Sequence, residues 1–185
     1  MKRLMMATMT LVLAFSLVSA QEKAKVEEKG EREKSEKATE IKWVRYDEGL
    51  KQARAESHHV LINFTTSWCG WCKKMNKTTF MEPEVVDIIS KKFVAVKVDG
   101  DSKEILDVDG YKIAERDLAR SEYRVTGYPA YWFLKPNGEK LGVLPGYQDA
   151  DRFMEVLFYM SENLYDKMTF EEYMKSGGRK AHGKS

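Results

Sequence analysis

Residues 60–74 read VLINFTTSWCGWCKK, and they contain both cysteines of the chain, Cys69 and Cys72. The segment opens with a compact apolar run, Val60–Phe64, whose single polar interruption is Asn63, and such a run is typical of a buried central strand. A helical stretch begins directly after the second cysteine. We therefore expect Cys69 at the start of a helix, beside unpaired backbone amides and the positive end of the helix dipole, where a thiolate is stabilised.

The spacing of the two cysteines favours redox chemistry. A separation of three residues lets Cys72 fold under Cys69 on the first helical turn, where its thiol can resolve a mixed disulfide. In this interpretation Cys69 is the exposed nucleophile and Cys72 is the resolving thiol. Gly70 permits close approach between the two, and Trp71 stands where such motifs often have a proline.

Other interpretations of the cysteine pair remain open at this point. A structural disulfide across so short a loop restricts the unfolded chain little, by roughly 3 kcal/mol or less. Half of a zinc site needs further ligands, but His58 and His59 are adjacent and would point to opposite faces of a strand. The pair could also be unrelated buried thiols, although the glycine and tryptophans around them favour an exposed site.

The composition of the 185-residue chain limits the class of protein. A chain of this length with 43% hydrophobic residues is one domain with extensions. The formal charge of +2 comes from Lys2 and Arg3, and without them 29 basic residues balance 29 acidic ones, which argues against a nucleic-acid-binding protein. With only 2 cysteines, a scaffold of several disulfides and a four-cysteine zinc site are both excluded.

The first residues indicate export from the cytoplasm. Lys2 and Arg3 precede the apolar run Leu4–Val18, and small residues follow up to Ala20, a pattern typical of a secretory signal peptide cut after that alanine. A retained membrane anchor is the alternative, but the run is too short for a hydrocarbon core of about 30 Å. We therefore expect residues 1–20 to be a signal peptide and the mature protein to be periplasmic or secreted, without stable insertion in the membrane.

Both ends of the mature chain differ from its middle. Residues 21–40 are mostly charged and contain one sizeable apolar residue, Val26, so they are predicted to form a flexible linker. Residues 161–176 are predicted to form a C-terminal helical extension in which Thr169 begins a short capped helix. Residues 177–185 are predicted to be a disordered tail.

The segment between these extensions, residues 41–160, alternates strand-like and helix-like patterns. Strands are predicted at 41–46, 60–64, 93–98, 128–134 and 140–144, and helices at 48–57 behind an Asp47 cap, after Cys72, from Pro83, at 114–123 and behind an Asp149 cap. This order predicts an α/β fold with a central mixed sheet of about four to five strands flanked by helices. Residues 101–113 are expected to form a polar connection.

Two motifs, read together, resemble the thioredoxin superfamily. Residues 63–75 contain a Trp-Cys-Gly-x-Cys-Lys motif, and residues 123–130 contain a Val-x-Gly-x-Pro motif. The similarity covers residues 42–160. Within the superfamily the chain is similar to secreted bacterial thioredoxin-related proteins and to the C-terminal domain of the membrane thiol:disulfide interchange reductase, most clearly at residues 79–85.

The resemblance implies a thioredoxin-like fold and a set of site residues. Cys69 and Cys72 would be the catalytic pair, and Pro129 would be a cis-proline that faces their disulfide. The implied substrate groove comprises Trp68, Gly70, Trp71, Tyr128 and Pro129, with Gly127 and Gly146 beside it. No cofactor and no metal is predicted, and the implied partners are protein thiols and disulfides with an upstream electron donor.

Asn63 departs from the pattern of the family. A buried aspartate is common at this position, where it helps to deprotonate the resolving thiol, whereas an amide cannot take up a proton near neutral pH. We therefore expect release of the mixed disulfide to be slower or to use water or another group. Lys73 and Lys74 are expected to be solvated, and the connection at 101–113 is longer than the family requires, so it is a candidate partner-specific element.

The favoured function is a thiol:disulfide oxidoreductase that reduces protein disulfides with the Cys-Gly-Trp-Cys dithiol. A thioredoxin-like binding module with structural cysteines stays open. So does a disulfide oxidase or isomerase, because the direction of electron flow depends on the reduction potential. A group of aspartates lacks the closing glutamate of a calcium-binding loop, so we interpret it as part of a solvated loop: Asp99, Asp101, Asp107 and Asp109.

Overall fold

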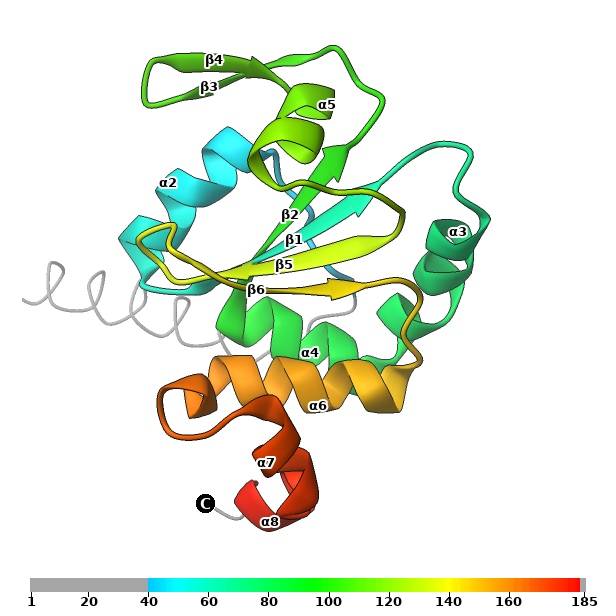
Figure 1. Cartoon of the computed structure of the whole chain (residues 1–185), viewed down its shortest axis with the longest axis vertical. Coiled ribbons are helices and arrows are strands. Elements are labelled where there is room, and N and C mark those ends of the chain that lie inside the picture. The colour runs from blue at the N-terminus through cyan, green and yellow to red at the C-terminus, as the bar shows by residue number, and fades with distance from the viewer. Residues whose placement is uncertain (1–39, 184–185) are drawn as a thin grey trace, which may run out of the picture. The chain divides into compact units, whose positions relative to one another are not determined.

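The computed structural model describes residues 40–183, and Figure 1 shows them as a central sheet with helices around it. The predicted signal peptide and residues 21–39 of the predicted linker lie outside this range. Within residues 40–183, no helix is long and apolar enough to cross a lipid bilayer.

Four strands form the central sheet in the order β2-β1-β5-β6. β1 (His59–Thr65) is parallel to β2 (Phe93–Asp99) and antiparallel to β5 (Ala130–Leu134). β6 (Lys140–Pro145) pairs antiparallel with β5 at one edge of the sheet. This mixed sheet confirms the predicted α/β fold class.

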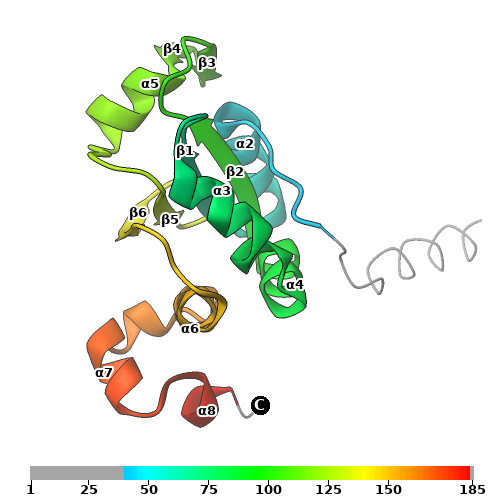
Figure 2. The ribbon, with the colours of Figure 1, turned by 90° about the vertical axis from the view of Figure 1, so that its right-hand side faces the viewer.

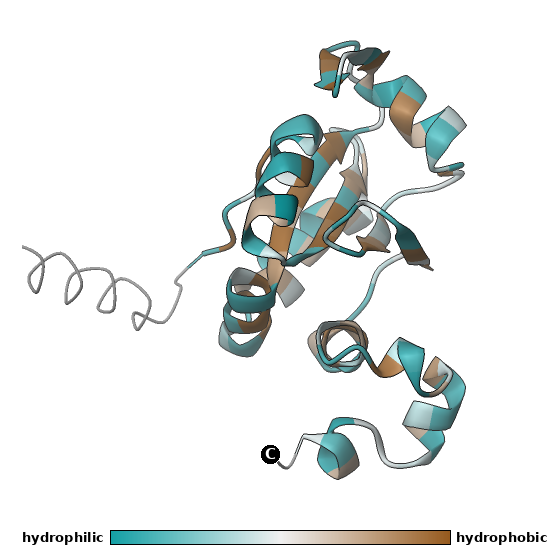
Figure 3. Cartoon of the chain, turned by 90° about the vertical axis from the view of Figure 1, so that its left-hand side faces the viewer, coloured by the Kyte–Doolittle hydropathy of each residue, from teal (hydrophilic) through white to brown (hydrophobic). Residues whose placement is uncertain are grey.

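Helices cover both faces of the sheet (Figure 2). One face packs against α2 and the segment around α5, and the other packs against α3, α4 and α6. The bounds of these helices are Tyr46–Glu56 for α2, Gly70–Lys77 for α3, Pro83–Lys92 for α4, Glu115–Asp117 for α5 and Ala150–Ser161 for α6. Apolar residues concentrate on the strands, whereas the outer faces of the helices are mostly hydrophilic (Figure 3).

β1 is the central buried strand that its apolar composition predicts. All of its residues are buried. Side chains alternate across a strand, so Leu61 and Asn63 lie on the face covered by α3, whereas Ile62 and Phe64 lie on the face covered by α2. Asn63 is therefore buried under the helix that follows the cysteines.

Local sequence explains where several helices begin. Pro83 occupies the first turn of α4, where its missing N–H removes no hydrogen bond. The Asp149 carboxylate caps α6 by accepting a backbone N–H at 2.8 Å. Both starts agree with the prediction, but α2 begins directly after Arg45 and Asp47 lies within its first turn, so the predicted Asp47 cap is wrong.

The predicted strand at residues 41–46 is also wrong. Only Val44 pairs with the sheet, through one bridge to Val96 of β2. The Val44 N–H donates to the Ala95 carbonyl at 2.9 Å, and the Val44 carbonyl accepts the Lys97 N–H at 3.0 Å. The chain turns into α2 directly afterwards, so the pairing does not extend into a strand.

The predicted polar connection at residues 101–113 contains a β-hairpin. Its strands, β3 (Ile105–Val108) and β4 (Tyr111–Ala114), form a separate two-stranded sheet. Leu106 and Ile113 face each other across this hairpin and are buried against the main core. The apolar alternation of each strand is too short to stand out among the charged residues around it.

The hairpin turn and the helix after it have unusual backbone geometry. Asp109 and Gly110 both have positive φ, 53° and 90°, which is the conformation that a two-residue hairpin turn requires. The predicted helix at residues 114–123 consists of α5 followed by a π-helical turn, Leu118–Glu122. This segment is short and lies beside the hairpin in Figure 1.

The chain continues after α6 into two short helices. α7 (Phe170–Lys175) begins with the predicted cap, because Thr169 and Glu172 exchange hydrogen bonds in a capping box. The described part of the predicted disordered tail forms α8 (Gly178–His182), so that part of the prediction is wrong.

Long-range contacts explain why α8 is ordered. The Arg179 backbone N–H and guanidinium both donate to the Glu155 carboxylate on α6, at 2.9 and 3.3 Å. The Ser176 hydroxyl lies 2.7 Å from a ring nitrogen of His182. The contacts with Glu155 join residues 24 positions apart, so the composition of the tail does not reveal them.

Candidate active site

Cys69 and Cys72 form a disulfide at the point where the chain enters α3. The S–S distance is 2.02 Å and the Cα atoms are 5.3 Å apart. Cys69 is the N-cap residue of α3, and its Sγ accepts the backbone N–H of Cys72 at 3.0 Å. The predicted placement of Cys69 at a helix start is therefore confirmed, with a helix amide directed at its sulfur.

The expectation of an exposed Cys69 is not met in this disulfide form. Cys69 and Cys72 are each 4% exposed, because the sulfurs turn back onto the first turn of α3. The exposed surface at this point belongs to their neighbours, since Trp68 is 66% exposed and Trp71 is 56% exposed. A partner that approaches the disulfide therefore meets these indole rings first.

Trp68 connects the disulfide to the implied groove residue Tyr128. The two rings meet edge to face with centroids 5.8 Å apart. The Trp68 indole N–H donates to the Asp101 carboxylate, at the start of the segment that carries the hairpin. A Cβ atom at Gly100 would lie 1.9 Å from the Tyr128 hydroxyl, so that glycine is needed to accommodate the ring. Burial, and then the Asp101 charge, raise the pKa of Tyr128, while Arg120 opposes them.

Trp71 packs against Tyr147, a residue to which no sequence motif points. The ring centroids are 5.3 Å apart. The Lys74 ammonium lies 4.9 Å from the Trp71 ring and 4.7 Å from the Tyr147 ring, at cation–π distances. Lys74 is thus held by two aromatic rings and is not simply a solvated lysine. Tyr147 directly follows Gly146, a residue predicted to lie beside the groove, and this position in the sequence is the feature that could have identified it.

The peptide bond before Pro129, in the loop before β5, has the cis geometry that the resemblance implies. The Tyr128-Pro129 peptide bond is cis. The Pro129 carbonyl accepts the Gly146 N–H at 2.8 Å, and Gly146 has a φ of 78°. Tyr128 and Pro129 therefore lie beside Gly146, whereas Gly127 has open space around it and no close approach that demands glycine.

Asn63 is one of several buried residues whose side-chain polar atoms have no hydrogen-bond partner in the described part of the chain. Asn63 is 3% exposed, and its Oδ1 has no partner among residues 40–183. The same is true of the Tyr131 hydroxyl and the Thr66 hydroxyl. Tyr131 is the register partner of Asn63 on β5, and burial raises the pKa of its phenol. No group of this set takes up a proton near neutral pH, so the expected slower release of the mixed disulfide stays a prediction.

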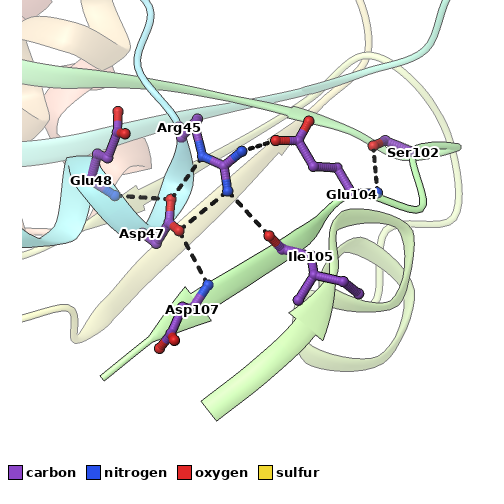
Figure 4. A network of polar contacts seen from close by, with 7 residues as sticks. All are labelled: Arg45, Asp47, Glu48, Ser102, Glu104, Ile105 and Asp107. Carbon is purple, nitrogen blue, oxygen red and sulfur yellow. Dashed lines mark hydrogen bonds and ion pairs between the residues drawn. The ribbon is translucent and has the colours of Figure 1, made fainter. Parts of the chain in front are cut away.

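Figure 4 shows how the hairpin is fastened to the start of α2. The Arg45 guanidinium donates to Asp47 at 3.2 Å and to the Ile105 carbonyl at 3.2 Å, and it forms an ion pair with Glu104. Asp47 also accepts the Asp107 N–H at 3.1 Å. Burial raises the pKa of Asp47, but the hydrogen bonds from Arg45 and Asp107 outweigh it and hold the pKa below its usual range. The hairpin is therefore a fixed part of the domain.

The histidines and aspartates considered as metal ligands have other contacts. A His59 ring nitrogen lies 2.9 Å from the Tyr165 hydroxyl. Asp107 accepts the Gly110 N–H at 2.8 Å, and Asp109 pairs with Arg54 at 2.8 Å. In the part of the chain that the structure describes, no three histidine, cysteine or acidic side chains converge as metal ligands.

Comparisons with known proteins agree with this geometry. The family model of the Thioredoxin-like domain matches residues 46–161. The thiol:disulfide interchange protein DsbD of Pseudomonas fluorescens is 28% identical over 109 residues, which are 57% of this chain and 17% of that protein. The disulfide bond reductase DsbH of Chlamydia pneumoniae is 27% identical over 113 residues, which are 59% of this chain and 67% of that protein.

A solved structure supports the same assignment. The thioredoxin from Thermus thermophilus is 29% identical, and its superposition has a TM-score of 0.53 and covers 64% of this chain and 85% of that one. The matched segment ends at residue 161, so the extension with α7 and α8 lies outside the family match. The two motifs, the fold and the family match agree, and the chain belongs to the Thioredoxin-like domain family.

Proposed function

We propose that this protein is a thiol:disulfide oxidoreductase that reduces disulfides of protein substrates with the Cys69/Cys72 pair. The observation that carries the proposal is the disulfide at the start of α3, with the Cys69 sulfur at the helix N-cap and the Cys72 N–H directed at it. A helix amide and the positive end of the helix dipole stabilise the thiolate that the reaction needs. The names of the relatives DsbD and DsbH support the same activity.

The reaction consists of two exchanges. In the reduced protein the Cys69 thiolate attacks one sulfur of the substrate disulfide, forms a mixed disulfide and releases the other substrate sulfur, which takes up a proton. Cys72 then loses its proton, and its thiolate attacks the Cys69 sulfur and displaces the second substrate thiol. The substrate has gained two electrons and two protons, and the protein holds the Cys69–Cys72 disulfide. An upstream dithiol protein restores the reduced pair by the same exchange in reverse.

The proposed compartment is the cell envelope or the exterior, since the sequence before residue 21 has the pattern of a secretory signal peptide. There the donor would be another exported or membrane-bound thiol protein. Comparing the mass of the N-terminus of the envelope protein with that of an Ala20→Arg variant tests cleavage after Ala20. A start at Gln21 is expected only for the wild-type chain.

Reduction of insulin with dithiothreitol as donor tests the activity. We expect turnover by the wild type and none by Cys69→Ser, while Cys72→Ser should accumulate a mixed disulfide through Cys69. Wild-type activity no greater than that of Cys69→Ser would favour the binding module. The reduction potential of the pair, measured against glutathione, separates a reductase from an oxidase, because a low potential favours electron donation.

A labelling experiment tests the assignment of roles. Cys69 should react first when the reduced protein meets a limiting amount of iodoacetamide, because its sulfur lies at the N-cap of α3. Peptide mass mapping identifies the labelled residue. Preferential labelling of Cys72 would reverse the roles of the two cysteines.

A further inference from the structure

A groove runs from the loop before β5 along the outer part of the sheet. Its volume is about 440 Å³, within the range of about 300–1,000 Å³ that is usual for binding clefts. The floor is apolar and includes Val125, Trp132 and Val143. Val143 is 50% exposed although it is a strand residue paired with Trp132, so the short segment around α5 leaves this part of the sheet uncovered.

The groove is continuous with the surroundings of the disulfide. Its walls include Tyr128, which contacts Trp68, and Gly146, which precedes the Tyr147 that contacts Trp71. Trp68 and Trp71 each directly precede one of the two cysteines in the chain. A chain bound at the disulfide can therefore continue into the groove without leaving the surface.

The edge of the sheet beside the groove offers free backbone groups. β6 is the last strand of the sheet among the described residues. The Gly146 N–H donates to the Pro129 carbonyl, and hydrogen-bonded and non-bonded pairs alternate along an antiparallel ladder. The pair Trp132/Val143 is therefore a non-bonded one, so the N–H and carbonyl of Val143 point outward from the edge. An extended peptide can add to this edge as a further strand.

The polar groups of the groove indicate which peptide fits. Arg124 lines the groove in a left-handed backbone conformation, with φ 51°, and the Lys140 ammonium lies 4.3 Å from the Tyr123 ring. Within residues 40–183, neither cation forms an ion pair with a carboxylate, although the Lys140 ammonium donates to the Glu122 backbone carbonyl at 2.6 Å. The Trp132 indole nitrogen is buried and has no acceptor in the described part of the chain. An incoming chain thus meets an apolar floor with Arg124 in its wall and the Lys140 ammonium 5.8 Å from the Trp132 ring.

We propose that this groove binds an extended segment of the protein substrate next to its reactive cysteine, with an aliphatic side chain against Trp132 and Val143 and a carboxylate facing Arg124 and Lys140. The proposal rests on the proposed function and adds a substrate class to it: disulfides flanked by alternating aliphatic and acidic residues. Binding in the groove places the neighbouring disulfide over the indole rings beside Cys69.

The first arm of the test is kinetic. The probe is a synthetic peptide in which Val-Glu-Val flanks both sides of a cysteine joined to glutathione by a disulfide, and a second probe has Lys in place of Glu. Val143→Glu should lower kcat/KM for the acidic probe about tenfold, the loss that follows from removing one apolar contact, and should leave turnover of a small-molecule disulfide unchanged. Ile105→Glu is the matched control, since Ile105 is a strand residue that is 54% exposed on the hairpin. Equal rates for Val143→Glu and the wild type, or a preference for the basic probe, would overturn the proposal.

The second arm does not depend on redox activity. A probe with serine in place of cysteine is titrated into the oxidised protein, and the indole N–H signals of its 4 tryptophans are followed by NMR. The signal that Trp132→Phe removes should move with the acidic probe and not with the basic one. If the Trp132 signal moves with the acidic probe in a protein that reduces no disulfide, the proposed function is refuted, but the groove is still a peptide-binding site. If the Trp132 signal does not move with the acidic probe, the proposal is overturned. If the protein is then also a dimer that Val143→Glu dissociates, the β6 edge is assigned to self-association.

Discussion

Asn63→Asp places a carboxyl group where the chain has a buried amide without a partner for its oxygen. Asn63 is 3% exposed, and its Oδ1 has no donor within residues 40–183, so at least one oxygen of the new carboxylate would lack both water and hydrogen bonds. Burial of this kind raises the pKa of a carboxyl group above its usual value of about 3.9. The protonated form is then favoured in the folded state.

The size of the effect follows from linkage. A rise of about two pKa units, moderate for a buried carboxyl group, corresponds to about 2.7 kcal/mol at about 1.36 kcal/mol per unit. The folded variant binds more protons than the unfolded chain between about pH 4 and pH 6, so its stability falls as the pH rises through that window. Below about pH 4 both states are protonated and the penalty disappears.

Urea unfolding of the oxidised protein at pH 4 and pH 7.5 measures this difference. Asn63→Leu is the matched control, since it removes the amide without adding a titratable group, and its loss of stability should be the same at both pH values. An equal loss for Asn63→Asp at both pH values would show that the carboxylate is solvated and would refute the burial argument.

The same variant tests how the resolving thiol loses its proton. A carboxylate under α3 can accept the Cys72 proton, whereas the amide cannot, so Asn63→Asp should speed release of the mixed disulfide. Stopped-flow kinetics with a trapped peptide substrate measure that step. An unchanged or slower rate would mean that another group already moves the proton, and Lys73 or a bound water would be the next suspects because Lys74 is held by Trp71 and Tyr147.

Other side chains give separate expectations. Met75→Ala should lower the free energy of unfolding by about 2–5 kcal/mol, because Met75 is fully buried on the inner face of α3, while Met81→Ala, at a side chain that is 65% exposed, should change it by less than about 0.5 kcal/mol in denaturant titrations. Burial raises the pKa of Glu155, but hydrogen bonds from Tyr173 and Arg179 outweigh it and hold the pKa below its usual range, so this stabilisation is lost as the pH falls through the depressed folded value. Glu155→Gln should remove that acid dependence, and a wild-type slope in the variant would contradict the assignment. Burial lowers the pKa of His59, so the unfolded chain takes up a proton first and stability should fall as the pH drops below about 6.5; thermal unfolding of His59→Gln should show a weaker dependence there.

Features that depend on neighbours in the sequence were predictable. The apolar run of β1, Pro83 at the start of α4, the Asp149 cap and the Thr169 capping box each follow from contacts within a few residues. The cysteine pair also belongs here, because a strand, a short turn and a helix in succession place Cys69 at a helix N-cap. Contacts between residues this close in sequence allow few alternative local structures, so the sequence alone predicts them.

Features that depend on distant residues were not predictable in the same way. Val44 makes one bridge and not a strand because of where α2 begins, and β3 and β4 are stable because Leu106 and Ile113 reach the main core. The order in α8 depends on Glu155 of α6. In each case the partner is far away in the chain, so the local sequence does not indicate the contact.

The chain alone thus determined the α/β class, the position of the Cys69/Cys72 pair at the head of a helix and the missing carboxylate at residue 63, because each is written in adjacent or regularly spaced residues. Only the tertiary structure decided that both cysteines are buried in the disulfide form, that Tyr147 joins Trp71, and that Val143 remains uncovered at the sheet edge. The physical reason is that burial and contact depend on which surfaces the folded chain brings together. The segment of α5 and the π-helical turn after it is short, and the sequence does not show that it leaves the part of the sheet around Val143 uncovered.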